Sequence, residues 1–303
     1  MLIAIDHGNK QVKTVHGNAI VSGVQKSKTR PYGRDVLKYG GSYYTLSAQR
    51  IPYQKDKTTD ERFFILSLFA IADPHLSLDA DKSMEVFRGW QDYVARLEAN
   101  WRAVVGEEDT VVIAGDLSWG MSLAGALRDM QFLHSLPGRK LLLKGNHDYW
   151  WSTRRKMDTF FEEHGLHSLQ IVHNDAALVE GIAVCGTRGW FFDAEEDADK
   201  KVVLREAGRL RTSIQAAKAL GGEPVAFLHY PPVTQSARCE EMMRVLEDEG
   251  IRRCYYGHLH GPATRAAVTG EREGIRFSLI SADYLSFCPK LVPAGLEGDA
   301  SST

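Results

Sequence analysis

Residues 141–148 have the sequence LLLKGNHD, and their apolar run ends at Asn146, His147 and Asp148. Short apolar runs bounded by turn residues predict buried β-strands. Four other stretches follow the same pattern, each ending on side chains that can bind a metal or transfer a proton. These are Leu68–Ala72 before Asp73-Pro74-His75, Val111–Ala114 before Gly115-Asp116, Val225–Leu228 before His229, and Cys254–Tyr256 before Gly257-His258-Leu259-His260. Ligands gather at the carboxyl ends of strands in sheets with helical crossovers, so these five ends predict one shared site.

The composition is that of a globular protein. A chain of 303 residues suits one large domain or two smaller ones. The hydrophobic content of 44% and the charged content of 25% are ordinary for such a chain. A net charge of -2 gives no global attraction to nucleic acid or to an anionic membrane. The composition therefore indicates neither partner.

The cysteines and the first residues favour a cytoplasmic protein. The four cysteines, Cys185, Cys239, Cys254 and Cys288, have no CxxC spacing, and three of them lie beside apolar residues, which favours reduced thiols. Residues 1–6 lack the basic segment and the long apolar core of a signal peptide. No run approaches the roughly 20 apolar residues that span a bilayer. We therefore expect a soluble, cytoplasmic protein that has no membrane partner.

The organisation of the chain changes near residue 63. Residues 1–62 contain short apolar stretches joined by Gly and Asn turns, which predict a β-rich segment. Residues 63–290 alternate strand and helix patterns, and the tail, residues 291–303, is predicted to be disordered. Apolar residues three or four apart predict helices over 82–105, 123–133, 150–163 and 204–220. Further strands are predicted over 168–172, 176–185 and 275–281. The mixture indicates a layered α/β architecture.

The five strand ends, taken in order, carry the motifs D-x-H, G-D, G-N-H-D, H and G-H-x-H. Over about residues 65–290 the chain therefore resembles the calcineurin-like metallophosphoesterases. The resemblance implies a four-layer α/β/β/α sandwich that holds two metal ions. It also implies a set of ligands: Asp73, His75 and His260 for one ion, Asn146, His229 and His258 for the other, and Asp116 bridging both.

These residue types suit the chemistry that the resemblance implies. A bridging carboxylate can hold two cations about 3.5–4 Å apart. A mixture of imidazole and carboxylate favours Mn, Fe, Zn or Ni over Ca. A water shared by two such ions has a lowered pKa and becomes a hydroxide nucleophile near neutral pH. In-line attack on phosphorus then develops charge on oxygens that the metal ions stabilise.

Other residues near the motifs are candidates for catalysis and substrate binding. His147 is predicted to protonate the leaving oxygen or to stabilise the transition state, and Asp148 to orient it. The alternative for His147 is a buried histidine whose nitrogens bond to the backbone. Arg188 is a candidate phosphate clamp, with a surface ion pair as its alternative. Asn146 is expected beside the substrate as well as the metal. Pro74 makes His75 the ligand whose geometry is hardest to predict.

A second resemblance concerns the start of the chain. Residues 6–13, DHGNKQVK, are similar to the first phosphate loop of actin-like ATPases of the bacterial plasmid-segregation branch. The likeness extends to about Ala72, but no second phosphate loop or adenosine site follows. We therefore predict an incomplete actin-like segment joined to a complete phosphoesterase, and we do not expect the first 62 residues to bind ATP.

The leading hypothesis is a dinuclear metal-dependent phosphoesterase that acts on a small phosphate ester or a phosphoprotein. One alternative is an actin-like nucleotide-binding or filament protein. Another is a metal-binding scaffold without activity, although the presence of both His147 and Asp148 argues against it. Loops set specificity, so the motifs do not distinguish a phosphomonoester from a phosphodiester substrate.

Overall fold

The computed structural model describes residues 67–190 and 197–294, together with six strands among residues 3–46. The chain divides into two compact units, one comprising residues 1–67 with 293–303 and the other residues 68–292. All five strand ends singled out in the sequence belong to the second unit.

The first unit contains two small antiparallel sheets. One joins β1 (Ile3–Ala4), β2 (Gln11–Thr14) and β3 (Ala19–Val21), and the other joins β4 (Val24–Ser27), β6 (Ser42–Leu46) and β5 (Val36–Tyr39). These strands confirm the β-rich character predicted for the start of the chain. Most of the loop over 6–13 and residues 295–303 of the predicted tail lie outside the described residues.

The first sheet of the second unit has the order β10-β9-β8-β7-β17. Its strands are β7 (Leu68–Ile71), β8 (Thr110–Ala114), β9 (Arg139–Leu143), β10 (Leu169–Ile171) and β17 (Lys290–Val292). All neighbours run parallel except β17, which is antiparallel to β7. Every residue of β7 and β8 is buried, as is typical of parallel strands covered on both faces. The carboxyl ends of β7, β8 and β9 therefore share one edge.

The second sheet has the order β11-β12-β13-β14-β16-β15. Its strands are β11 (Ala177–Val179), β12 (Ile182–Thr187), β13 (Glu223–Leu228), β14 (Arg253–Tyr256), β15 (Gly270–Arg272) and β16 (Ile275–Leu279). The four central strands are parallel, and the edge strands β11 and β15 are antiparallel to their neighbours. The carboxyl ends of β12, β13, β14 and β16 therefore also share an edge.

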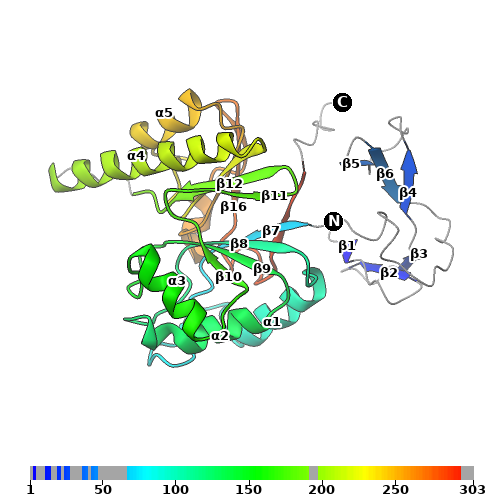
Figure 1. Cartoon of the computed structure of the whole chain (residues 1–303), viewed down its shortest axis with the longest axis horizontal. Coiled ribbons are helices and arrows are strands. Elements are labelled where there is room, and N and C mark those ends of the chain that lie inside the picture. The colour runs from blue at the N-terminus through cyan, green and yellow to red at the C-terminus, as the bar shows by residue number, and fades with distance from the viewer. Residues whose placement is uncertain are drawn as a thin grey trace. The chain divides into compact units, whose positions relative to one another are not determined.

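The helices cover the outer faces of the two sheets (Figure 1). α1 (Tyr93–Val104), α2 (Leu127–Ser135) and α3 (Arg154–Glu163) share a hydrophobic cluster with the first sheet. α4 (Asp197–Ala219) and α5 (Glu240–Asp248) share another with the second sheet. A third cluster contains residues from both sheets and fills the space between them. The predicted four-layer α/β/β/α sandwich is thus confirmed.

Two predicted elements differ from the structure. The strand predicted over 176–185 is a hairpin of β11 and β12, because Glu180 and Gly181 form its turn with φ of 47° and 80°. Positive φ at both central residues gives a turn whose twist matches the flanking strands. The helix predicted over 82–105 splits into the 3-10 helix η3 (Met84–Val86) and α1, since Asp92 adopts a left-handed φ of 51°.

Three short helical pieces and α5 complete the described elements. Besides η3 these pieces are η4 (Ala124–Ala126) and η5 (Gly261–Ala266). α5 had no predicted counterpart; it buries Met242, Met243 and Leu246 on one face and has Glu240 in its first turn, where the helix dipole favours negative charge.

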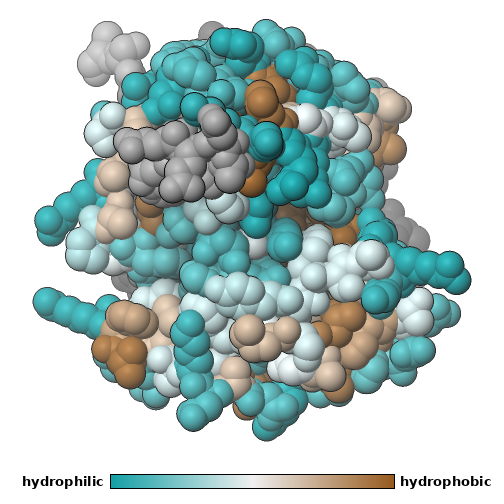
Figure 2. Space-filling model, turned by 90° about the vertical axis from the view of Figure 1, so that its left-hand side faces the viewer, coloured by the Kyte–Doolittle hydropathy of each residue, from teal (hydrophilic) through white to brown (hydrophobic). Residues whose placement is uncertain are grey.

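The surface combines polar residues with scattered apolar ones. Val86, Met121 and Leu204 are the most exposed of the large hydrophobic side chains among the described residues. Figure 2 shows one face of the molecule, on which hydrophobic side chains occur in small groups among hydrophilic ones. Such scattering is normal for a protein exterior. Among the helices that the structure describes, none is both long enough and apolar enough to cross a membrane.

The packing of α1 against the first sheet leads to a stability prediction. Leu97 is 0% exposed within that cluster, whereas Leu204 on α4 is 62% exposed. We expect Leu97→Ala to lower the free energy of unfolding by about 2–5 kcal/mol, because it leaves a cavity. We expect the matched control Leu204→Ala to change it by about 0.5 kcal/mol or less. Urea denaturation measures both, and similar losses in the two variants would contradict the assigned packing.

Candidate metal centre

Backbone hydrogen bonds join the loops that follow the strands. The N–H of Asp73, after β7, donates to the carbonyl of Gly115, after β8, at 2.9 Å. On the second sheet the N–H of Gly257 donates to the carbonyl of His229 at 3.1 Å. The N–H of His258 donates to Asp73 Oδ2 at 2.8 Å, so the strand ends of one sheet meet those of the other. Residues from both sheets therefore contribute to one site.

Four of the predicted ligands have a left-handed backbone. The φ angles are 59° at Asp73, 44° at His75, 51° at Asp116 and 70° at His258. A residue other than glycine in this region costs about 1–3 kcal/mol and persists only where the surrounding structure enforces it. Such outliers cluster at functional sites, and these four turn the chain sharply where each strand ends.

Two glycines allow the loops to approach the carboxylates closely. A Cβ atom at Gly145 would overlap the side chain of Asp116, and one at Gly257 would overlap the side chains of Asp73 and Ala72. Only glycine leaves enough room at these two positions. The glycine in each of the motifs G-N-H-D and G-H-x-H is therefore required by packing around the carboxylates.

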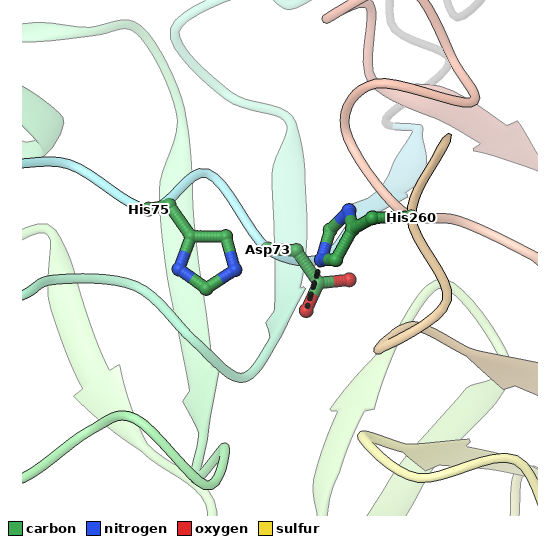
Figure 3. A group of neighbouring side chains, drawn as sticks. All are labelled: Asp73, His75 and His260. Atoms are coloured by element: carbon green, nitrogen blue, oxygen red, sulfur yellow. Dashed lines mark ion pairs between the residues drawn. The ribbon is translucent and has the colours of Figure 1, made fainter. Parts of the chain in front are cut away.

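The first group of side chains comprises Asp73, His75 and His260 (Figure 3). His260 Nε2 lies 3.6 Å from Asp73 Oδ1. One potential ligand atom from each residue lies within 4.8 Å of the others. Asp73 Oδ1 and His260 Nε2 are both buried and have no hydrogen-bond partner among the described residues. Because buried polar atoms are nearly always satisfied, this pair of atoms suits a bound cation.

The second group surrounds the amide of Asn146. Its Oδ1 lies 2.6 Å from His229 Nε2 and 3.1 Å from His258 Nδ1. His229 is fully buried, and its Nδ1 lies 3.2 Å from the carbonyl oxygen of Ala114. If Nδ1 carries the proton and donates it to that carbonyl, the lone pair of Nε2 points toward Asn146. An amide oxygen and imidazole nitrogens are suitable ligands for a divalent transition metal.

Asp116 lies between the two groups. Its Oδ2 is 3.7 Å from His75 Nε2 in the first group and 3.5 Å from His229 Nε2 in the second. Its Oδ1 accepts a hydrogen bond from the N–H of His147 at 2.7 Å. Asp73, Asp116 and His229 themselves form a set whose ligand atoms could hold a metal ion.

Charge and burial compete in this cluster. Burial, aided by the nearby carboxylate of Asp73, raises the pKa of Asp116 to about 8. Burial also opposes the ionisation of Asp73, but the imidazole of His260 outweighs it and the pKa of Asp73 falls below its ordinary value. Burial lowers the pKa of His258 to about 3, so its imidazole is neutral. Burial opposes the charge on His260, but the carboxylates of Asp73 and Asp283 raise its pKa to about 10. Imidazoles around two buried carboxylates form a donor set that fits divalent cations, whose binding releases the protons that the ligands hold.

His147 lies at the edge of the cluster. Its side chain is partly exposed, and its ring centroid is 4.5 Å from that of Trp119 and 5.8 Å from that of His75. Its Nδ1 lies 3.3 Å from the hydroxyl of Tyr149. The ring therefore has access to solvent as well as to the ligands, which a histidine that contacts a substrate requires.

Asp148 does not contact the imidazole of His147, although its place in the G-N-H-D motif predicts that it orients this ring. Its buried carboxylate accepts hydrogen bonds from the N–H groups of Gly145, Asp116 and Leu117 at 2.7, 2.9 and 2.9 Å. The indole N–H of Trp150 donates to it at 2.9 Å. Among the described residues it makes no hydrogen bond to the imidazole of His147. Asp148 therefore ties the loop after β8 to the loop after β9, because buried N–H groups at both strand ends need an acceptor.

Arg188 follows β12, and its carbonyl accepts a hydrogen bond from the N–H of Tyr230 at 2.8 Å. The ring centroid of Tyr230 is 4.2 Å from that of His258, so Tyr230 connects the backbone of Arg188 with the second group. Its guanidinium is 3.7 Å from the buried carboxylate of Glu206 and 4.6 Å from the ring of Trp190. The alternative predicted for Arg188 was an ion pair; it has one, with a carboxylate that is buried rather than on the surface.

Comparison with known proteins identifies the family. The sequence model of the calcineurin-like phosphoesterases matches residues 66–262. The chain belongs to this family. Membership implies a metal-dependent phosphoesterase, and the Asp and His groups described above could bind the metal ions. The predicted metallophosphoesterase resemblance is thus confirmed.

The individual proteins that resemble this chain share little sequence identity with it or match only a short part of it. The chain is similar to the phosphopantetheinyl hydrolase PptH of Mycobacterium tuberculosis, with 14% identity, a TM-score of 0.45, and coverage of 78% of this chain and 98% of that one. TT1561 of Thermus thermophilus has 13% identity and a TM-score of 0.44, covering 77% of this chain and 100% of that one. The Gene 66 protein of Mycobacterium phage L5 is 43% identical over 58 residues. That match spans only 19% of this chain and 28% of the phage protein.

None of these similarities supports the actin-like resemblance of the first 62 residues. The family match begins at residue 66, and most of the loop over 6–13 lies outside the described residues.

The structure brings together all seven predicted metal ligands of this phosphoesterase. His75, whose geometry was hardest to predict, is buried, and its ring stacks on Trp119 with centroids 5.0 Å apart. Asp283 was not predicted; its Oδ1 lies 2.9 Å from His260 Nδ1. It follows β16, so the rule that found the other strand ends, a polar side chain after an apolar run, also points to it.

The bonding of Asp148 predicts a loss of stability when its carboxylate is removed. We expect Asp148→Ala to lower the free energy of unfolding by about 3 kcal/mol or more, because four backbone N–H donors lose their acceptor in the interior. The neighbouring variant His147→Ala removes a partly exposed ring, and we expect it to cost about 1 kcal/mol or less. Urea denaturation compares the two, and equal midpoints would contradict the structural role of Asp148.

Proposed function

We propose that this phosphoesterase uses two divalent metal ions to hydrolyse a phosphomonoester or a phosphodiester. The observation that carries the proposal is the position of Asp116. One oxygen of its carboxylate lies 3.7 Å from His75 Nε2 and 3.5 Å from His229 Nε2, so a single carboxylate faces both ligand groups. Two metal ions about 3.5–4 Å apart commonly share such a carboxylate.

In this proposal Asp73, His75 and His260 hold one ion, while Asn146, His229 and His258 hold the other. The mixture of imidazole, carboxylate and amide donors favours Mn, Fe, Zn or Ni. When bound, the two ions supply an acidified water as the nucleophile and stabilise the charge that develops on the phosphoryl oxygens. The ligand side chains hold the two groups in fixed positions, so that the phosphoryl group is oriented between them.

The chain's own residues have two further roles in the proposed reaction. His147, partly exposed beside the first group, protonates the leaving oxygen or donates a hydrogen bond to it. Arg188, together with Asn146, binds the phosphoryl oxygens from the side of the second group, since a guanidinium matches the geometry of a phosphate. The burial of Glu206 beside Arg188 supports this role, because the ion pair holds the guanidinium in place.

We further propose that residues 63–290 form the catalytic domain. The family match over 66–262 and the compact unit over 68–292 support this division. The substrates that suit the proposal are a small phosphate ester or a phosphoprotein. The four cysteines are free thiols and three of them are buried, which supports work in a reducing compartment such as the cytoplasm.

The proposed function predicts activity that depends on metal ions and on Asp116. We expect metal-free protein to hydrolyse bis-p-nitrophenyl phosphate after addition of Mn²⁺, and excess EDTA to abolish this turnover. Asp116→Asn removes the shared charge and is expected to lower turnover by more than about 100-fold. Asp158→Asn, which alters an exposed carboxylate on α3, serves as a control and is expected to keep wild-type activity. Equal turnover by Asp116→Asn and the wild type would rule out the proposed site.

The role proposed for Arg188 predicts a change in substrate binding. We expect Arg188→Ala to raise KM about 10–100-fold with a smaller effect on kcat, because a charge-assisted hydrogen bond to phosphate is worth about 1.5–3 kcal/mol. Arg209→Ala is the matched control, since Arg209 contacts the same Glu206 at 2.7 Å. Steady-state kinetics of both variants test the assignment. A KM unchanged in Arg188→Ala, or raised equally in both variants, would remove Arg188 from the substrate site.

A further inference from the structure

The imidazole of His260 has a different environment at each nitrogen. Its Nδ1 lies 2.9 Å from Asp283 Oδ1. Its Nε2 is buried without a hydrogen-bond partner among the described residues and lies 3.6 Å from Asp73 Oδ1. A proton on Nδ1 satisfies the contact with Asp283, and it leaves the lone pair of Nε2 directed at Asp73. That is the tautomer a metal ligand requires.

Asp283 is itself held firmly in place. Its Oδ2 accepts a hydrogen bond from the N–H of Gly261 at 2.8 Å, and its Oδ1 accepts one from the N–H of Tyr284 at 2.9 Å. Its side chain is only 12% exposed. These bonds tie the loop after β16 to the loop that carries His260. The carboxylate is therefore held in one position, from which it can orient the imidazole.

The other histidines of the centre are oriented by different means. His229 has a backbone carbonyl, that of Ala114, 3.2 Å from its Nδ1. The ring of His75 stacks on Trp119, and its Nδ1 has no hydrogen-bond partner in the described part of the chain. A carboxylate, that of Asp73, also lies 3.5 Å from His229 Nδ1, but Asp73 is itself a proposed ligand. Among the described residues His260 thus differs from both in having, within hydrogen-bond distance of its Nδ1, a carboxylate outside the ligand set, which makes its other nitrogen a more basic ligand.

We propose that Asp283 is a positioning residue for the first metal ion. It fixes the tautomer and ring orientation of His260 and adds negative charge behind that ligand. Asp283 lies beyond residue 262, where the family match ends, so this contribution comes from the segment that follows β16. The inference rests on the proposed dinuclear function, since it assigns Asp283 to one of the two ions only.

The test is a calorimetric titration of metal-free protein with Mn²⁺, which needs no substrate and no turnover. We expect the wild type to bind two ions. Asp283→Ala is expected to weaken one of the two binding constants by about 10–100-fold and to leave the other within about twofold. Asp283→Asn keeps an acceptor for the Nδ1–H but loses the charge, so we expect a smaller loss at the same ion. Asp248→Asn, an exposed carboxylate paired with Arg211, is the control.

Each outcome separates this inference from the function on which it rests. Two ions bound by both Asp283 variants with wild-type constants would overturn the role of Asp283 and leave the dinuclear proposal intact. Equal weakening of both ions would also overturn it, since a merely structural role acts on the whole site. A wild-type protein that binds no Mn²⁺ would overturn the proposed function together with the inference. If Asp283→Ala does not fold, the nearly isosteric Asp283→Asn carries the test.

Discussion

The close approach of two buried carboxylates and the histidines around them is the constraint on which the centre depends. Asp73 and Asp116 come from adjacent parallel strands, so their backbone positions follow from the register of β7 and β8. Both are almost fully buried, and their charges repel each other. Burying two such charges is unfavourable unless cations or hydrogen-bond donors compensate for it. The backbone N–H groups of His258 and His147 donate hydrogen bonds to Asp73 and Asp116, and the metal ions of the proposed function would supply the remaining compensation.

The surrounding structure explains how this arrangement is held. Left-handed backbone at Asp73 and Asp116 turns the chain immediately after each strand. Glycine at 145 and 257 lets neighbouring loops pack directly against the carboxylates. Asp148 then binds the N–H groups of two loops at once. The motif residues therefore fall into two classes. Some face the proposed ions, and others hold in place the loops that follow the parallel strands. The site requires both.

Several features could be predicted because they depend on local sequence. Apolar runs that end on Asp, Asn or His predict both the strands and the residues at their carboxyl ends, since buried parallel strands are continuously hydrophobic. The helix over 82–105 was wrong in its first half, because apolar spacing does not reveal the left-handed φ of Asp92 that begins α1. The single strand predicted over 176–185 was also wrong, because Glu180 and Gly181 interrupt the apolar run and the chain reverses direction there.

By itself the sequence determined the fold class, the order of the motifs and the types of donor atom, because hydrophobic periodicity and side-chain chemistry are properties of neighbouring residues. Only the tertiary structure decided which partner each polar group has. Asp148 is next to His147 in the chain but bonds to the backbone of two strand ends, whereas Asp283 lies 23 residues from His260 and contacts its imidazole. Such pairings depend on which strands lie next to each other in a sheet and on how the loops that follow them fold. The separation of two residues along the chain does not reveal the distance between their side chains.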